Sequence, residues 1–208
     1  MTEKKEFAFI YLHGFKSSPE SNKATFIRKY CQDKKIEFLC PPLDIDPKVA
    51  ISQVSTVIDN VTNVVMETII IGSSLGGFYT AWAMQNHPGA EKCKAIILNP
   101  TTNPSKDLES EVEQIKSWQE KTLGKKYFKN THLDYLKQLE KSVNPPIINS
   151  KKIFLVAAKG DEILDWNDMV SFFKDCEQYV IEGSDHGLSN FSLHWPMISK
   201  FIYSGKDI

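Results

Sequence analysis

The regular alternation of short apolar runs with longer helical stretches constrains the fold of this chain most. Six runs rich in β-branched and aromatic residues predict strands, at residues 7–12, 36–40, 68–71, 95–98, 153–157 and 178–181. Helices are expected at about residues 19–32, 47–66, 75–86, 166–176 and 193–203. Nearly continuous apolar strands that alternate with helices are typical of a mainly parallel sheet covered on both faces. The sequence therefore predicts an α/β protein with a central sheet of about six strands.

The first helix carries a local start signal. Ser18 is a suitable N-cap, and Pro19 follows it at the first helical position. Proline fits there because its missing N–H would have no helical partner anyway. The first helix is therefore expected to begin at residue 19.

Residues 101–150 interrupt the alternation, because they contain no convincing strand. Apolar residues spaced three or four apart predict two or three short amphipathic helices in this segment. They are Val112, Ile115 and Trp118, and then Leu133, Leu136 and Leu139. The insertion, between the fourth and fifth strands, either shields an edge of the sheet or covers a substrate. With it, residues 1–208 are expected to form a single domain.

Composition limits the classes of partner. The 208 residues, 41% of them hydrophobic, suffice for one sizeable core. The 25 Lys and Arg residues nearly balance the 26 Asp and Glu residues, so no broad electrostatic field favours nucleic acid or an anionic membrane. No apolar run reaches the roughly 18 residues that a membrane span needs. A small-molecule partner is therefore expected.

The N-terminal residues and the cysteines predict a cytoplasmic location. The first ten residues, MTEKKEFAFI, are charged and then strand-like, unlike the apolar core of a secretory signal. Four cysteines are scattered along the chain without a C-x-x-C pair, namely Cys31, Cys40, Cys93 and Cys176. This pattern suits reduced, packed thiols better than a disulfide framework or a metal site.

The stretch Gly72-Ser73-Ser74-Leu75-Gly76 lies between a predicted strand and a predicted helix. It matches G-x-S-x-G, the nucleophile elbow, whose glycines let the strand and the helix approach closely. Ser74 has glycines two residues before and after it, whereas Ser73 has Ile71 and Leu75 at those positions. The glycine patterns of phosphate-binding loops are absent from this stretch. Ser74 is therefore the candidate nucleophile, and Ser73 is expected to support or cap the turn.

A serine nucleophile needs a base and a group that orients the base. Asp161 and His186 follow the fifth and sixth predicted strands, in the chain order expected after an elbow serine. Asp165 and Asp185 remain alternative acids. However, Asp165 is well placed to cap the next helix, and Asp185 directly precedes His186, so its side chain would tend to point away from the imidazole.

The first predicted strand ends in Leu12-His13-Gly14-Phe15. In a fold with a nucleophile elbow, a backbone N–H of this turn and the N–H that follows the serine form the oxyanion hole. The candidate donors are the N–H groups of Phe15 and Leu75. His13 is expected to have a structural role.

Several of these stretches together resemble a known family. They are YLHGFKSSPESNKA, GSSLGGFYTAW, LNP, KGDEILDW and EGSDHGL, and they occur in this order along almost the whole chain. They resemble the YqiA-like esterases, small bacterial members of the α/β-hydrolase superfamily. The resemblance implies a carboxylic-ester hydrolase that lacks the first strands of the full superfamily sheet. It also implies that Ser74, Asp161 and His186 occupy the catalytic positions.

The expected activity is hydrolysis of small-molecule esters with short to medium acyl chains, through an acyl-enzyme on Ser74. No metal or organic cofactor is needed. A thioesterase or amidase shares the acyl-enzyme step and stays open, as does a binding protein with an idle triad. Aromatic residues in and near the insertion would either line an acyl pocket or pack helices together. They are Trp118, Tyr127, Phe128 and Trp166.

Overall fold

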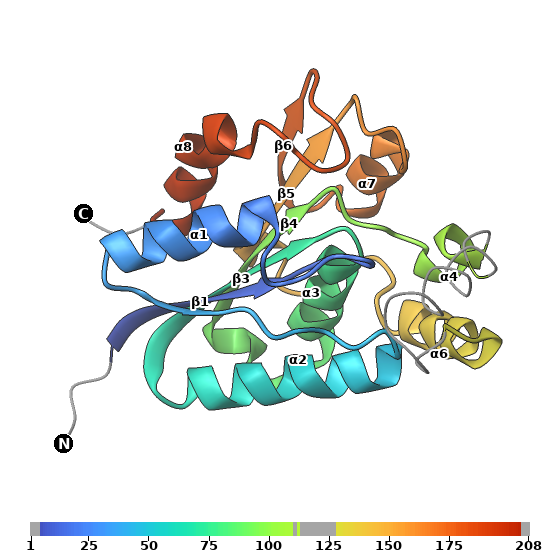
Figure 1. Ribbon diagram of the computed structural model, residues 1–208, viewed down its shortest axis with the longest axis horizontal. Coiled ribbons are helices and arrows are strands. Elements are labelled where there is room, and N and C mark those ends of the chain that lie inside the picture. The colour runs from blue at the N-terminus through green and yellow to red at the C-terminus, as the bar shows by residue number, and fades with distance from the viewer. Residues whose placement is uncertain (1–4, 110–111, 113–127, 205–208) are drawn as a thin grey trace.

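The computed structural model describes residues 5–109, 112 and 128–204, which form one sheet with helices on both faces (Figure 1). All strand pairs are parallel, and the strand order is β2-β1-β3-β4-β5-β6. The strands are β1 (Lys5–Leu12), β2 (Glu37–Leu39), β3 (Val65–Ser73), β4 (Cys93–Leu98), β5 (Ile153–Ala158) and β6 (Glu177–Ile181). The predicted α/β class and the parallel six-stranded sheet are confirmed.

Alternating side chains of the strands build two hydrophobic layers. Phe9 and Tyr11 of β1 pack on the side of α1 (Asn22–Asp33) and α8 (Phe191–Ile202). Ala8 and Ile10 face the opposite layer, with α2 (Pro47–Thr62), α3 (Leu75–Asn86) and α7 (Trp166–Phe172). The two layers lie on opposite sides of the sheet in Figure 1. Helices on both faces bury residues 7–12 of β1, all of β5 and most of β3 and β4, which explains their nearly continuous apolar sequences. The edge strands β2 and β6 stay partly exposed.

The predicted start of the first helix is wrong by three residues. The N-cap is Ser21, whose hydroxyl accepts a hydrogen bond from Ala24 N at 3.4 Å. Ser18 instead begins a turn that closes with a 3.1 Å bond from Ser21 N to Ser18 O. Pro19 occupies the second position of this turn, where its restricted φ fits as well as it does at a helix start. Ser18 and Pro19, which predicted a helix start, therefore form a turn before the helix.

The third strand is longer than predicted, and the helix before it is shorter. α2 ends at Thr62 rather than near residue 66, and β3 begins at Val65. Residues 65–67 pair with β1, in the register Lys5↔Val65 and Phe7↔Glu67. The spacing of apolar residues predicted a helix that continues to residue 66. Pairing with β1, which is distant in sequence, decides instead that β3 begins at Val65.

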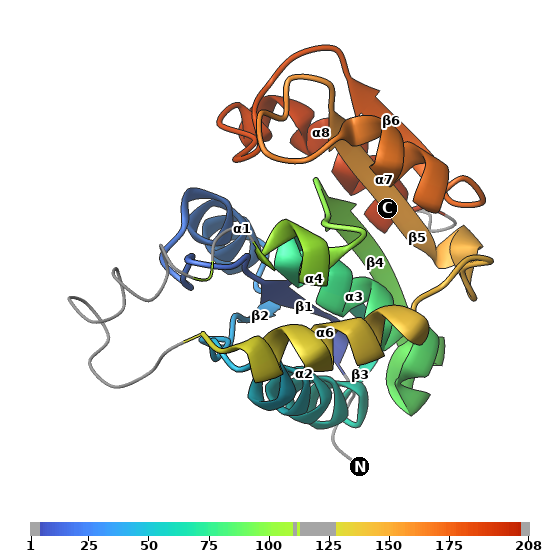
Figure 2. The same cartoon turned by 90° about the vertical axis from the view of Figure 1, so that its right-hand side faces the viewer.

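Between β4 and β5, the α-helices whose bounds lie within the described residues are α4 (Pro104–Asp107) and α6 (Asn130–Lys141), and Val112 is also helical. Two short 3₁₀ helices have bounds within the described residues: η1 (Pro88–Lys92), before β4, and η3 (Ser150–Lys152), before β5. Leu133, Leu136 and Leu139 form the buried side of α6, which contacts α2 and crosses it in Figure 2. Of the residues that predicted helices here, Ile115 and Trp118 fall outside the described residues. Within the described part of the chain, no helix is long and apolar enough to cross a membrane.

All four thiols are free. Burial raises the pKa of Cys31, Cys40 and Cys93 to about 12, and that of Cys176 to about 11. Because the thiolate is the reactive form, these four cysteines are poor nucleophiles at neutral pH.

Candidate active site

The strand order reverses between β1 and β3, which are neighbours inside the sheet. In parallel sheets, ligands bind beyond the carboxyl ends of the strands at such a reversal. The predicted site residues follow these ends. Ser74 follows β3, the His13–Phe15 turn follows β1, and Asp161 and His186 follow β5 and β6.

Ser74 occupies a strained turn between β3 and α3. Its φ is 56° and its ψ is −120°, a backbone conformation that costs about 1–3 kcal/mol in a residue with a side chain. The turn is held by bonds from Ser74 N to Leu98 O at 3.0 Å and from Gly77 N to Ser74 O at 2.9 Å. Hydrogen bonds to β4 and within α3 therefore fix the position of the serine.

The glycines on either side of Ser74 are required by close backbone contacts. A Cβ atom at position 72 would lie 2.2 Å from Gly76 O. At position 76 it would lie 2.0 Å from Leu12 O and 2.7 Å from His13 O. Real Cβ atoms essentially never approach backbone atoms so closely. The G-x-S-x-G pattern thus lets α3 pack directly against the ends of β3 and β1.

Ser74, His186 and Asp161 form a continuous chain of hydrogen-bond distances. Ser74 Oγ lies 3.1 Å from His186 Nε2, and His186 Nδ1 lies 2.8 Å from Asp161 Oδ2. The Asp161 side chain is fully buried, and the His186 side chain is 17% exposed. The second Asp161 oxygen accepts bonds from Ile163 N at 2.9 Å and Leu164 N at 2.8 Å. Both carboxylate oxygens are therefore held in place.

The alternative acids have other partners. Asp165 caps α7 by accepting a 2.8 Å bond from Asn167 N. Asp185 Oδ1 accepts a 2.8 Å bond from Ser189 N. Of the three aspartates, Asp161 therefore lies against the imidazole of His186. Ser73 is buried at the end of β3, and its side chain bonds with the Tyr11 hydroxyl.

His13 braces the turn that approaches Ser74. Its Nε2 accepts a 3.0 Å bond from Leu43 N, so Nδ1 carries the hydrogen and donates to Gly14 O at 2.9 Å. Burial lowers the pKa of His13, which favours this neutral form. A Cβ at position 14 would lie 3.1 Å from Ser74 Cβ, which is tighter than most real Cβ contacts, so glycine lets this turn lie close to Ser74. His13 thus joins the turns after β1 and β2 and places Phe15 beside the serine.

A cavity of about 220 Å³ opens over Ser74 and His186. Phe15 and Leu75 also line it. Leu75 is the first residue of α3, where backbone N–H groups have no partner within the helix. The remaining lining residues are Lys16, Thr101, Asp107, Leu108, Ile163 and Leu164. Within the described residues, no group of three or more His, Cys, Asp or Glu side chains is arranged to hold a metal ion.

Two of the four predicted pocket aromatics can be placed, and neither lines this cavity. Phe128 is buried, and its ring centroid lies 5.3 Å from that of Phe15. Trp166 lies beneath the Lys159 ammonium, with 5.1 Å between Nζ and the ring centroid. Trp118 and Tyr127 lie outside the described residues. Phe128 therefore packs against the ring of Phe15, which lines the cavity.

Asn99 is a site residue that the sequence did not reveal. It is fully buried at the end of β4, with φ at 39°. Its Nδ2 donates to Asp185 O and His186 O, both at 3.1 Å, and its Oδ1 accepts from Ala158 N at 2.8 Å. One side chain thus ties the end of β5 to the loop that carries His186. The one sequence feature that could have indicated Asn99 is its place directly after an apolar strand, in Leu98-Asn99-Pro100. Its hydrogen-bond partners are known only from the tertiary structure.

Glu162 and Gly160 also position the histidine loop. Glu162 Oε2 accepts a 2.9 Å bond from His186 N. A Cβ at position 160 would lie 2.1 Å from Ser184 O, so glycine lets the loops after β5 and β6 touch. Both residues belong to the KGDEILDW stretch, in which the sequence indicated Asp161 as the candidate acid but no role for Gly160 or Glu162.

Replacing Asn99 by aspartate should lower kcat of an esterase reaction by about 10²-fold, the typical effect of a small misplacement of a catalytic group. Aspartate has nearly the same shape and tolerates the same φ, but it directs an oxygen instead of a donor at two carbonyl oxygens. The histidine loop should therefore shift. The measurement is kcat on a p-nitrophenyl ester, with circular dichroism to verify folding. A folded variant with wild-type kcat would show that Asn99 does not position His186.

A comparison with models of known protein families identifies the family of the chain. The model of the uncharacterised protein family UPF0227 matches residues 8–203. The chain belongs to this family. The match confirms the resemblance to the YqiA-like esterases that the motifs indicated.

Solved structures with the α/β-hydrolase fold are similar over nearly the whole chain. Est1E from Butyrivibrio proteoclasticus is 17% identical, with a TM-score of 0.75 over 97% of this UPF0227 chain and 88% of Est1E. Mouse alpha/beta hydrolase domain-containing protein 10 is also 17% identical, with a TM-score of 0.72 over 96% of this chain and 91% of that one. The Pyrococcus furiosus esterase Pf2001 is 13% identical, with a TM-score of 0.66 over 95% and 83%. At these identities the likeness shows the fold.

Proposed function

We propose that this protein is a serine hydrolase that cleaves carboxylic esters through an acyl-enzyme on Ser74. The observation that carries the proposal is the hydrogen-bonded chain from Ser74 Oγ through His186 to the buried Asp161 carboxylate. Such a chain supplies what a serine hydroxyl lacks in water, namely a base held at hydrogen-bond distance and a group that orients this base.

The mechanism moves one proton back and forth. His186 Nε2 accepts the Ser74 hydroxyl proton as Oγ attacks the ester carbonyl, and Asp161 holds the Nδ1–H of the resulting imidazolium. The N–H groups of Phe15 and Leu75 stabilise the oxyanion. When the C–O bond to the alcohol breaks, His186 returns its proton to the leaving oxygen. Water then attacks the acyl-enzyme by the same route, which releases the acid and restores Ser74.

Relatives support the substrate class. The family resemblance is to esterases. Of the similar structures, Pf2001 is named as an esterase, and Est1E has been solved with ferulic acid bound. The cavity over Ser74, about 220 Å³, has room for small acyl esters. Short p-nitrophenyl esters are therefore the first substrates to test.

Labelling and turnover together test the activity. A fluorophosphonate reacts with a serine only when base and oxyanion hole are aligned, so it should modify wild-type protein at Ser74. Peptide mass spectrometry locates the label, and absorbance at 405 nm follows hydrolysis of p-nitrophenyl acetate and butyrate. If the folded protein takes up no label and releases no nitrophenol, a binding protein with an idle triad becomes the better description.

The acyl-enzyme step alone does not separate esterases from thioesterases and amidases. A matched panel decides between them: one acyl group presented as an oxygen ester, a thioester and an anilide. We expect the largest kcat/KM for the oxygen ester. A larger value for the thioester would keep Ser74 as nucleophile and change the substrate class.

A further inference from the structure

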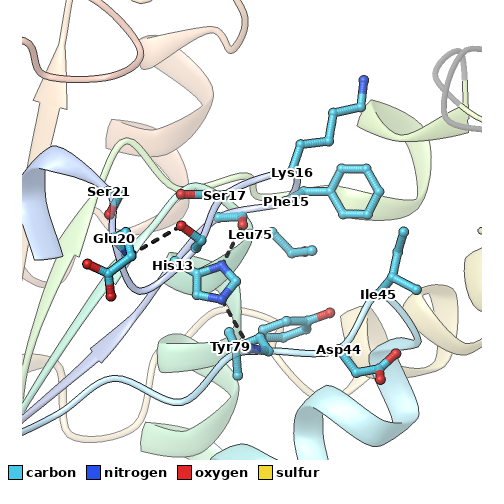
Figure 3. A pocket seen from close by; sticks show the side chains of 13 residues that line it. His13, Phe15, Lys16, Ser17, Glu20, Ser21, Asp44, Ile45, Leu75 and Tyr79 are labelled. Atoms are coloured by element: carbon cyan, nitrogen blue, oxygen red, sulfur yellow. Dashed lines mark hydrogen bonds between the residues drawn. The ribbon is translucent and has the colours of Figure 1, made fainter. Parts of the chain in front are cut away.

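A second cavity, of about 560 Å³, is larger than the one over Ser74. Figure 3 shows the side chains that line it. It opens between the loop after β1 and the loop after β2. The lining residues are His13, Gly14, Phe15, Lys16, Ser17, Ser18, Glu20, Ser21, Leu43, Asp44, Ile45, Leu75 and Tyr79. Its volume falls within the ~300–1,000 Å³ of typical ligand pockets, whereas the cavity over Ser74 is smaller than that range.

The two cavities meet at the proposed oxyanion hole. Phe15, Lys16 and Leu75 line both of them. A carbonyl oxygen bound by the N–H groups of Phe15 and Leu75 would therefore lie at their boundary. The two substituents of the carbonyl carbon must then point in different directions, one toward each cavity.

The position of His186 decides which substituent goes where. His186 lines the smaller cavity and must reach the leaving oxygen to protonate it. It follows β6, on one side of Ser74 in the strand order β2-β1-β3-β4-β5-β6. The larger cavity is built by loops that follow β1 and β2, on the other side. The alcohol therefore belongs in the smaller cavity, and the acyl group extends toward the larger one.

The lining of the larger cavity indicates the kind of acyl group. In Figure 3, Phe15, Ile45 and Tyr79 lie toward one end and Leu75 lies near the middle, while Ser17, Glu20 and Ser21 lie toward the other end. Asp44 and Lys16 are the charged lining residues on the side of Phe15 and Ile45. Tyr79 and Leu75 are buried, while Lys16, Ser17 and Glu20 are exposed at the rim. Phe128, packed behind Phe15, keeps the ring of Phe15 in place. An apolar group fits the inner end, and a polar substituent would meet the rim.

We infer that the larger cavity is the acyl-binding site and that it accepts apolar acyl groups of medium length or with an aromatic ring. The inference rests on the proposed function, because it assumes that Phe15 and Leu75 bind the carbonyl oxygen. It extends that function by naming the side of Ser74 on which the acyl group lies and the residues that limit its size.

Filling the cavity tests the assignment. Ile45→Trp places a large ring at the apolar end, so the ratio of kcat/KM for p-nitrophenyl octanoate to that for the acetate should fall at least about tenfold, the lower end of what a changed apolar pocket contact gives. Ser171→Trp is the matched control, because Ser171 lines the other large cavity that adjoins the one over Ser74, on the side of Asp107, Ile163 and Leu164. In this control the ratio should stay at the wild-type value. An unchanged ratio in Ile45→Trp, or a fall in Ser171→Trp instead, would overturn the assignment.

Binding of the product acid separates this inference from the proposed activity. In the Ser74→Ala background, calorimetry should show that octanoate binds and that adding Ile45→Trp weakens its binding at least about tenfold. If wild-type protein hydrolyses no ester, the proposed function fails, and octanoate binding still tests the cavity. If Ile45→Trp leaves octanoate affinity unchanged in a folded protein, the acyl site fails whatever the activity.

Discussion

Replacing Ser74 by alanine is expected to lower kcat for ester hydrolysis by roughly 10⁴-fold or more, the scale found when a triad serine is removed. The reason is local, because alanine removes the only atom that attacks the carbonyl and leaves His186 and Asp161 in place. Alanine also fits the space, so the fold should persist. Initial rates on p-nitrophenyl butyrate measure the effect, and fluorophosphonate labelling should disappear in parallel.

Ser73→Ala is the matched control, because it removes the same group from the adjacent residue. The Ser73 side chain bonds with buried Tyr11 and takes no part in the proposed mechanism. We expect this variant to keep most of the wild-type rate and to become slightly less stable. Retained turnover in Ser74→Ala together with an inactive Ser73→Ala would identify Ser73 as the nucleophile and refute the proposed site.

Gly76→Ala should have the largest effect on stability, a loss of roughly 3 kcal/mol or more in the free energy of unfolding. The new Cβ would lie 2.0 Å from Leu12 O and 2.6 Å from Leu12 C, so the backbone of β1 or α3 must move. Overpacking of this kind costs about 1–3 kcal/mol and sometimes more. It outweighs the gain of up to about 1 kcal/mol that alanine brings to a helix interior. Urea denaturation followed by circular dichroism measures the change.

Gly183→Ala provides the comparison for Gly76→Ala. Gly183 is exposed, and no heavy atom lies within 4 Å of the Cβ that alanine would add there. The same chemical change should leave the free energy of unfolding within about 0.5 kcal/mol of the wild-type value, as usual for surface substitutions. Equal stability of the two variants would mean that the backbones of α3 and β1 are not in tight contact.

Much of the fold could be predicted from local sequence. Strands buried on both faces are apolar almost throughout, so the centres of β1, β4 and β5 were evident from composition. Element boundaries were less certain. Pro19 fits a turn as well as a helix start, and the first residues of β3 are specified by pairing with β1. Pro19 was ambiguous because two local structures accept the same φ, and β3 was misjudged because its pairing strand is distant in sequence.

For the candidate site, the sequence indicated residues that lie in motifs whose glycines are required by close backbone contacts. The glycines around Ser74 are needed for close contacts, so they appear as a readable spacing. Asn99 and Glu162 had no such signal. Their side chains act on backbone groups of the His186 loop, 87 and 24 residues away. Short patterns do not encode contacts of that kind.

The sequence by itself determined the α/β class, the strained turn at Ser74 and the choice of Asp161 and His186 as its candidate partners, because each depends on local patterns of apolar residues, glycines and strand ends. Only the tertiary structure decided which atoms meet. It brought Ser74 Oγ, His186 and Asp161 to hydrogen-bond distances, and it formed a large cavity from the loops after β1 and β2. The physical reason is that parallel strands gather distant loops at one edge, where side-chain geometry depends on packing across the sheet.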